Sequence, residues 1–68
     1  MRQVLIYLGE SGQWVAEIPS LPGCVSQGST KEEAIQNIRE AIALHVEGLR
    51  AHNQPIPEDR LEALLIAV

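Results

Sequence analysis

The chain has 68 residues, of which 46% are hydrophobic, and this length accommodates one small domain whose core rarely supplies more than about 3–5 kcal/mol of stability. Five Lys plus Arg against nine Asp plus Glu give a formal net charge of −4, which provides no overall basic surface for a phosphate backbone and favours a basic partner. The single cysteine excludes an internal disulfide and a cysteine-rich zinc module, and the absence of an apolar run of ~20 residues excludes a membrane span, so we expect a soluble cytoplasmic protein.

Two extended segments open the chain. Residues 3–8 and 13–18 alternate in side-chain direction, and the Gly-Glu-Ser-Gly stretch at 9–12 is typical of a hairpin loop. The alternation predicts one face with Val4, Ile6, Leu8, Trp14, Ala16 and Ile18, and an opposite face with Leu5, Tyr7, Val15 and Glu17. We therefore expect an antiparallel pair of strands whose two faces both need cover.

A proline- and glycine-rich corner follows at 18–24. Pro19 and Pro22 each fix φ near −65° and lack a backbone donor, and Gly23 permits a sharp change of direction. This spacing predicts a fixed turn. Residues 24–27 are long enough for a short third strand, which we expect Gly28 to end.

A long helix is predicted from Thr30 to Ala51 or His52. Thr30 and Glu33 have the spacing of a capping box, in which each side chain bonds the backbone amide of the other residue. Apolar residues then recur at helical spacing at Ile35, Ile38, Ile42, Val46 and Leu49. Leu44 lies nearly opposite this stripe and is expected to face solvent or another chain, and Asn53 is expected to end the helix.

The last eight residues, 61–68, are ambiguous. Their Leu, Ala and Glu content favours a helix, whereas their position after Pro55 and Pro57 and their apolar ending also suit a buried strand.

Several motifs in this order resemble the HicB-like domain of bacterial toxin–antitoxin systems, over residues 7–57. They are Ile-Pro-x-Leu-Pro-Gly-Cys at 18–24, Gly-x-Thr-x-Glu-Glu-Ala at 28–34, Asn37, and Glu-Ala-Ile at 40–42. Ser20 and Ser29 stand where the family more often has Asp, a change between two turn- and cap-forming residue types. The resemblance implies an α+β fold of order β-β-β-α-β, a truncated RNase H-like domain with an antiparallel three-stranded sheet, one long helix and a final strand, 61–68, parallel to the first.

We expect no enzymatic activity, no metal site and no cofactor. Nuclease chemistry of the RNase H type needs several carboxylates around two metal ions, and the strands offer only Glu17, joined by Glu62 if the last segment is extended. His45 and His52 are about 10 Å apart along a helix, too far to share one metal. Cys24 has no base in a recognisable motif and is expected to be a small buried residue, and Trp14, without basic or aromatic company, is expected in a core or interface.

The resemblance implies an antitoxin-like binding module that neutralises a small basic HicA-type toxin, an mRNA-cleaving protein, by covering its active surface. Longer family members carry a C-terminal DNA-binding segment, and without one we expect a single domain over 1–68 that does not bind DNA alone. The alternative is a stand-alone oligomeric structural or regulatory protein of the same fold. In both cases we expect a homo-oligomer, with candidate partner or oligomer contacts at Leu5, Tyr7, Val15, Glu17 and Leu44. A neighbouring reading frame for a short basic protein would distinguish the two.

Overall fold

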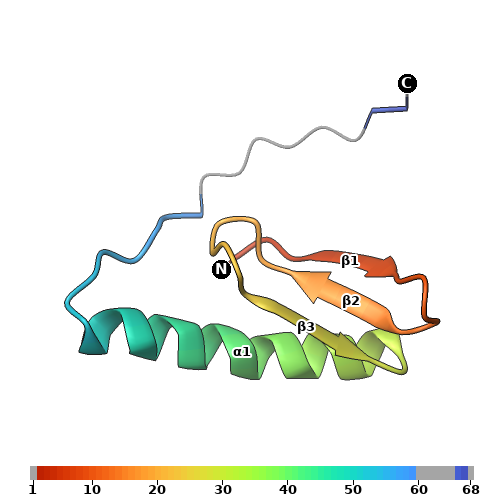
Figure 1. Cartoon of the computed structure of the whole chain (residues 1–68), viewed down its shortest axis with the longest axis horizontal. Coiled ribbons are helices and arrows are strands. Elements are labelled where there is room, and N and C mark those ends of the chain that lie inside the picture. The colour runs from red at the N-terminus through yellow and green to blue at the C-terminus, as the bar shows by residue number, and fades with distance from the viewer. Residues whose placement is uncertain (1, 60–65, 68) are drawn as a thin grey trace.

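A computed structural model of the chain describes residues 2–59 and 66–67. Its elements are β1 (Leu5–Leu8), β2 (Trp14–Glu17), β3 (Val25–Gly28) and α1 (Lys31–Ala51). The strands form an antiparallel sheet in the order β1-β2-β3, and α1 packs against one face of it (Figure 1). The expected α+β class is thus confirmed, although β1 begins two residues later than predicted and β2 is one residue shorter at each end.

The register confirms the predicted division of side chains between two faces. Ile6 lies opposite Ala16 and Leu8 opposite Trp14, on the side that faces α1, whereas Leu5 pairs with Glu17 and Tyr7 with Val15 on the other side. β3 lies one residue later than the predicted 24–27: Cys24 is outside the strand, and Gly28 pairs with Trp14 instead of ending the strand before it. Gly28 is also buried directly against the start of the helix.

The helix begins as predicted, with one change in its capping bonds. Thr30 is the N-cap and its hydroxyl accepts from the Glu33 amide at 3.0 Å. The Glu33 carboxylate does not bond the Thr30 amide as expected. It accepts from the Ser29 amide at 3.3 Å and the Ser29 hydroxyl at 3.1 Å, since Ser29 offers two donors to its two oxygens. At the other end, Asn53 has a φ of 53°, and its amide donates to the Arg50 carbonyl at 3.1 Å.

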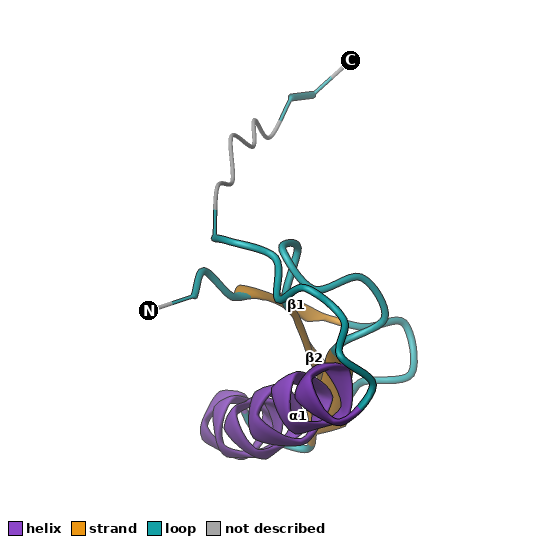
Figure 2. Cartoon of the chain, turned by 90° about the vertical axis from the view of Figure 1, so that its left-hand side faces the viewer, coloured by secondary structure: helices purple, strands orange, loops and turns teal. Residues whose placement is uncertain are grey.

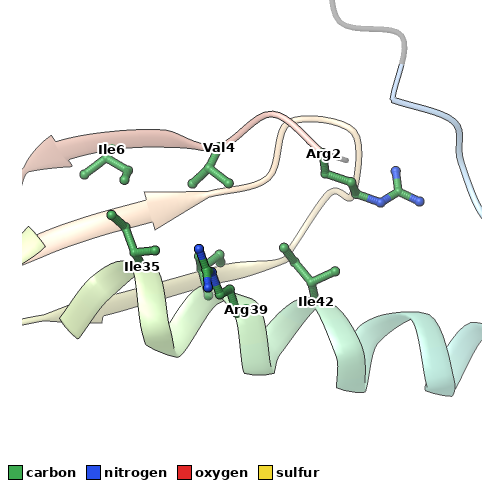
Figure 3. A pocket seen from close by; sticks show the side chains of 7 residues that line it. Arg2, Val4, Ile6, Ile35, Arg39 and Ile42 are labelled. Atoms are coloured by element: carbon green, nitrogen blue, oxygen red, sulfur yellow. The ribbon is translucent and has the colours of Figure 1, made fainter. Parts of the chain in front are cut away.

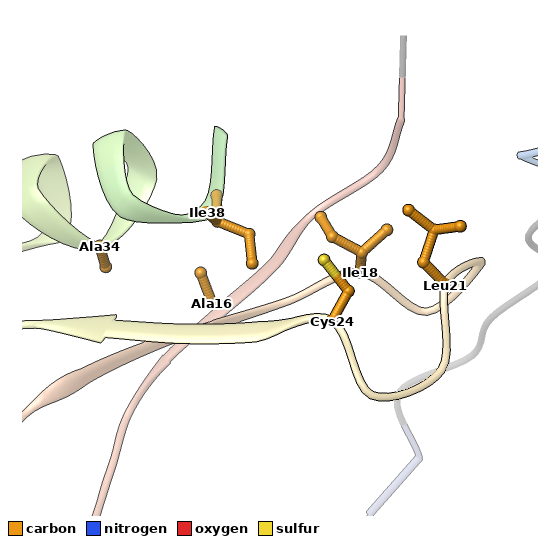
Figure 4. Packing of buried hydrophobic residues seen from close by; sticks show 6 residues of the cluster. All are labelled: Ala16, Ile18, Leu21, Cys24, Ala34 and Ile38. Carbon is orange, nitrogen blue, oxygen red and sulfur yellow. The ribbon is translucent and has the colours of Figure 1, made fainter. Parts of the chain in front are cut away.

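The buried core lies between α1, β2 and the proline–glycine corner. It consists of Ala16, Ile18, Leu21, Cys24, Ala34 and Ile38 (Figure 4). Leu21 is fully buried, a position that the sequence pattern did not indicate. Its amide donates to the Ile18 carbonyl, its own carbonyl accepts from the Cys24 amide at 2.9 Å, and Gly23 takes a φ of 86° beside it. The corner is therefore a packed part of the core and not only a turn.

The first strand extends beyond the cover of the helix. Val4 and Leu8, which we expected beneath α1, are 38% and 58% exposed. A helix about 10 Å wide spans roughly two strands that are ~4.8 Å apart, and α1 lies over β3 and β2. Figure 2 shows β1 as the strand that lies farthest from the helix.

The predicted last strand at 61–68 lies outside the described residues, apart from Ile66 and Ala67, which are in no helix or strand. Just before it, the carboxylate of Asp59 accepts from the Gln3 amide at 3.1 and 3.2 Å. This contact brings residue 59 beside the segment that leads into β1.

Candidate partner-binding surface

The face of the sheet turned away from α1 carries an exposed group of apolar side chains. Leu5 is 50% exposed, Tyr7 40% and Val25 51%. We call this surface the outer sheet face, and the register assigns to it Leu5, Tyr7, Val15, Glu17, Val25 and Gln27. Four of the five residues predicted as contacts are therefore brought together on one surface.

The sequence reasoning missed the two members of this face that lie on β3, the apolar Val25 and the polar Gln27. Val25 on β3 pairs with Glu17 on β2, and Leu5 on β1 pairs with the same Glu17 from the other side. The signal was present, because the buried Cys24 precedes Val25 and neighbouring strand residues point to opposite faces.

Two polar side chains on the outer sheet face bond each other. The Tyr7 hydroxyl donates to Glu17 Oε1 at 2.8 Å, a diagonal contact between β1 and β2. This hydrogen bond, with a smaller contribution from burial, raises the pKa of Tyr7 above its usual value. The hydroxyl therefore remains protonated, and remains a donor to Glu17, throughout the neutral pH range.

Leu44, the fifth predicted contact, lies elsewhere. It is 69% exposed, as expected, but it belongs to α1, which packs on the opposite face of the sheet. One planar partner surface cannot contact Leu44 and the outer sheet face together. The predicted set of contacts therefore divides into a four-residue surface and a separate residue.

A second exposed apolar feature is a groove of 570 Å³ between β1 and α1. Val4 and Ile6 point toward the helix, and Ile35 and Ile42 point back toward β1 (Figure 3). The remaining lining residues are Arg2, Ile38 and Arg39. Arg2 donates to the Ser20 hydroxyl at 3.0 Å, which fixes the N-terminal segment to the proline–glycine corner. Sequence reasoning did not predict the groove, since it forms where the helix stops short of β1.

The residues considered for catalysis or metal binding are not brought together. Cys24 is buried, and burial raises the pKa of its thiol, which makes it a poor nucleophile at neutral pH. The His52 ring nitrogen lies 2.8 Å from the Gly48 carbonyl at the end of α1, and His45 lies about two turns before His52. Within residues 2–59 and 66–67 there is no cluster of three His, Cys, Asp or Glu side chains suited to a metal ion.

Trp14 has a basic neighbour that the sequence reasoning did not expect. The Lys31 ammonium lies 4.8 Å from the centre of the Trp14 ring, within the range of a cation–π contact. The contact follows from the short connection between β3 and α1: Gly28 pairs with Trp14, and the helix begins three residues later at Lys31. Trp14 itself is half-buried beside the core, as predicted.

The helix formed by the described residues does not combine the length and hydropathy that a membrane crossing requires.

Comparison with known proteins gives a consistent set of relatives. The model of the family described as HicB-like antitoxin of bacterial toxin–antitoxin systems matches residues 3–66. A UPF0150 protein of Thermoplasma acidophilum is 46% identical over 63 residues, covering 93% of this chain and 91% of the relative. A UPF0150 protein of Synechocystis is 52% identical over 58 residues, covering 85% and 73% respectively. An uncharacterized 14.9 kDa protein of Haemophilus phage HP1 is 40% identical over 45 residues, which are 66% of this chain and 34% of the phage protein. No solved structure matches the chain significantly.

Proposed function

The chain belongs to the HicB-like antitoxin family, and from this premise we propose that it is an antitoxin-type binding module that neutralises a small basic HicA-type toxin. In this proposal the chain covers the active surface of the toxin and performs no chemistry itself. The toxin, an mRNA-cleaving protein, would be inhibited by exclusion of its substrate.

The outer sheet face is the observation that carries the proposal. Leu5, Tyr7 and Val25 are large side chains left partly in water, and fully burying a side chain of this size contributes roughly 1.5–3 kcal/mol. Glu17 is the one charged side chain among the strand residues of this face, which therefore has the sign that suits a basic partner. The net charge of −4 would also speed the encounter, more strongly at low salt.

The proposal first requires a reading frame for a small basic protein beside the gene for this chain, and that protein is then purified for the test. We expect the basic protein to cleave mRNA alone and to lose this activity when one equivalent of the chain is added. The double variant Leu5→Lys/Val15→Lys should restore cleavage, whereas Leu44→Lys, which adds a positive charge on the opposite side of the domain, should inhibit like the wild type. Undiminished cleavage with excess chain would reject the proposal, and stable homo-oligomers that ignore the basic protein would support the structural or regulatory alternative.

We also propose that residues 61–68 complete the sheet as a strand parallel to β1. Two observations support this: Asp59 contacts the Gln3 amide two residues before β1 begins, and the groove beside β1 is lined mainly by aliphatic side chains. Amide hydrogen exchange in β1 should then be slower in the whole chain than in a chain that ends at Arg60. Equal exchange rates would show that residues 61–68 do not pair with β1.

A further inference from the structure

Glu17 occupies an unusual position for the lone charge of an exposed surface. Its direct neighbours across the sheet are Leu5 on β1 and Val25 on β3, so apolar side chains flank it on both sides. The side chain is half-buried, and its Oε1 atom accepts from the Tyr7 hydroxyl. Among the described residues, no lysine, arginine or histidine forms an ion pair with it. One carboxylate oxygen, Oε2, thus has no hydrogen-bond donor from this part of the chain.

Any protein that covers the outer sheet face must remove water from this carboxylate. Burying a carboxylate without a cation is strongly unfavourable, whereas a cation with good geometry offsets the loss of water. A second copy of the chain would bring another Glu17, and no cation, from the same face. A basic partner would bring the missing charge.

We propose that Tyr7 and Glu17 together receive an arginine side chain of the partner, and that this contact selects a basic partner over a second copy of the chain. The inference rests on the proposed function for the identity of that partner. A planar guanidinium can donate to the free carboxylate oxygen of Glu17 while it stacks on the Tyr7 ring, which an ammonium group matches less well. Leu5, Val15 and Val25 then contact the apolar part of the same partner, around a Tyr–Arg pair of the kind that often dominates binding energy.

The arginine site is tested first without the toxin. Acetyl-arginine amide is titrated into the ¹⁵N-labelled chain, with acetyl-citrulline amide as a neutral probe of nearly the same shape. We expect shifts of the backbone amide signals confined to the outer sheet face with the arginine probe, and none with citrulline. Glu17→Gln should abolish the shifts, whereas Glu47→Gln, which removes the same charge from an exposed position on α1, should preserve them. Equal shifts with both probes, or shifts that survive Glu17→Gln, would overturn the proposal.

The second arm measures the dissociation constant for the neighbouring basic protein. Glu17→Gln should raise it more than about tenfold and reduce its dependence on salt, Tyr7→Phe should raise it less, and Glu47→Gln should leave it nearly unchanged. Glu17→Gln should at the same time strengthen self-association, because it removes the charge that a second copy cannot neutralise. A low dissociation constant for the toxin that Glu17→Gln does not change would overturn the arginine site and leave the proposed function unaffected. Arginine-specific shifts without toxin binding would reject the toxin and retain the site.

Discussion

Gly28 is the position where the smallest side-chain addition should have a large effect on stability. It is the last residue of β3 and lies against the first turn of α1. A Cβ atom at this residue would be 2.6 Å from the Ala34 amide nitrogen and 2.9 Å from both the carbonyl carbon and the Cβ of Glu33. Two of these three atoms belong to the helix backbone, so no side-chain rotation can relieve the overlap. The strand and the helix start must move apart.

The expected cost can be compared with what this domain has available. Overpacking of a filled site typically costs about 1–3 kcal/mol, and the rigidity of the neighbouring backbone places Gly28→Ala at about 2–3 kcal/mol. This is a large part of the ~3–5 kcal/mol that so small a core supplies. At about 4–8 °C for each kcal/mol, the melting temperature should fall by roughly 10–20 °C.

Thermal unfolding followed by circular dichroism checks this value, at one fixed protein concentration because self-association would shift the midpoint. Gly48→Ala is the matched control, since it makes the same chemical change in the last turn of α1, where nothing lies within 4 Å of the added Cβ. It should stabilise the domain by up to about 1 kcal/mol. A Gly28→Ala protein that melts no lower than the wild type would refute the close strand–helix contact.

Four further outcomes are expected. Thr30→Ala should cost roughly 0.5–2 kcal/mol through loss of the N-cap bond, and an unchanged melting temperature would contradict that role. Gly23→Val should be poorly folded, because a β-branched residue does not readily adopt a φ of 86°; wild-type yield and stability would show otherwise. Sedimentation equilibrium should detect only weak self-association of the wild type, because each copy buries a Glu17 carboxylate without a cation, and this association should be lost in Leu5→Lys/Val15→Lys. A monomeric wild type would show that the outer sheet face does not pair with a second copy. Burial raises the pKa of the Cys24 thiol, so the protonated thiol contributes to stability below the pKa of the unfolded chain, and this contribution is lost as the pH rises through the pKa of the folded chain. A thiol reagent at pH 8 should therefore react much more slowly with the native chain than with the urea-unfolded chain, and equal rates would contradict burial.

The parts of the fold that follow local rules could be predicted from the sequence. Alternation over the first two strands gave the correct two faces, and the Thr30 spacing gave the correct start of α1. These patterns depend on residues only a few positions apart. The burial of Leu21 was not predicted, because proline and glycine around it indicate a turn but not whether the turn packs against the core.

The features that were missed depend on how far apart whole elements lie. The lateral position of α1 over the sheet decides that β1 is left uncovered and that a groove opens beside it, and no local pattern encodes that position. The Lys31 contact with Trp14 likewise depends on where the helix start meets the sheet. The candidate site could be predicted only in part. Alternation alone places Leu5, Tyr7, Val15 and Glu17 on one face. The separation of Leu44 from them could be found only once the face on which the helix packs was known.

A single helix over three strands also explains why a surface so apolar can still be selective. The helix covers one face of β2 and β3, so the outer sheet face stays exposed whatever the helix does, and its apolar side chains alone would favour any partner, including a second copy. Removing Glu17 would make the face more apolar and less specific, because hydrophobic burial has no direction and no sign. With Glu17 held by the Tyr7 hydroxyl amid aliphatic neighbours, every partner must either supply a cation or leave a carboxylate desolvated. In the arginine site that we propose, the one charge that weakens generic association is therefore the residue that would give the face its preference for a basic protein.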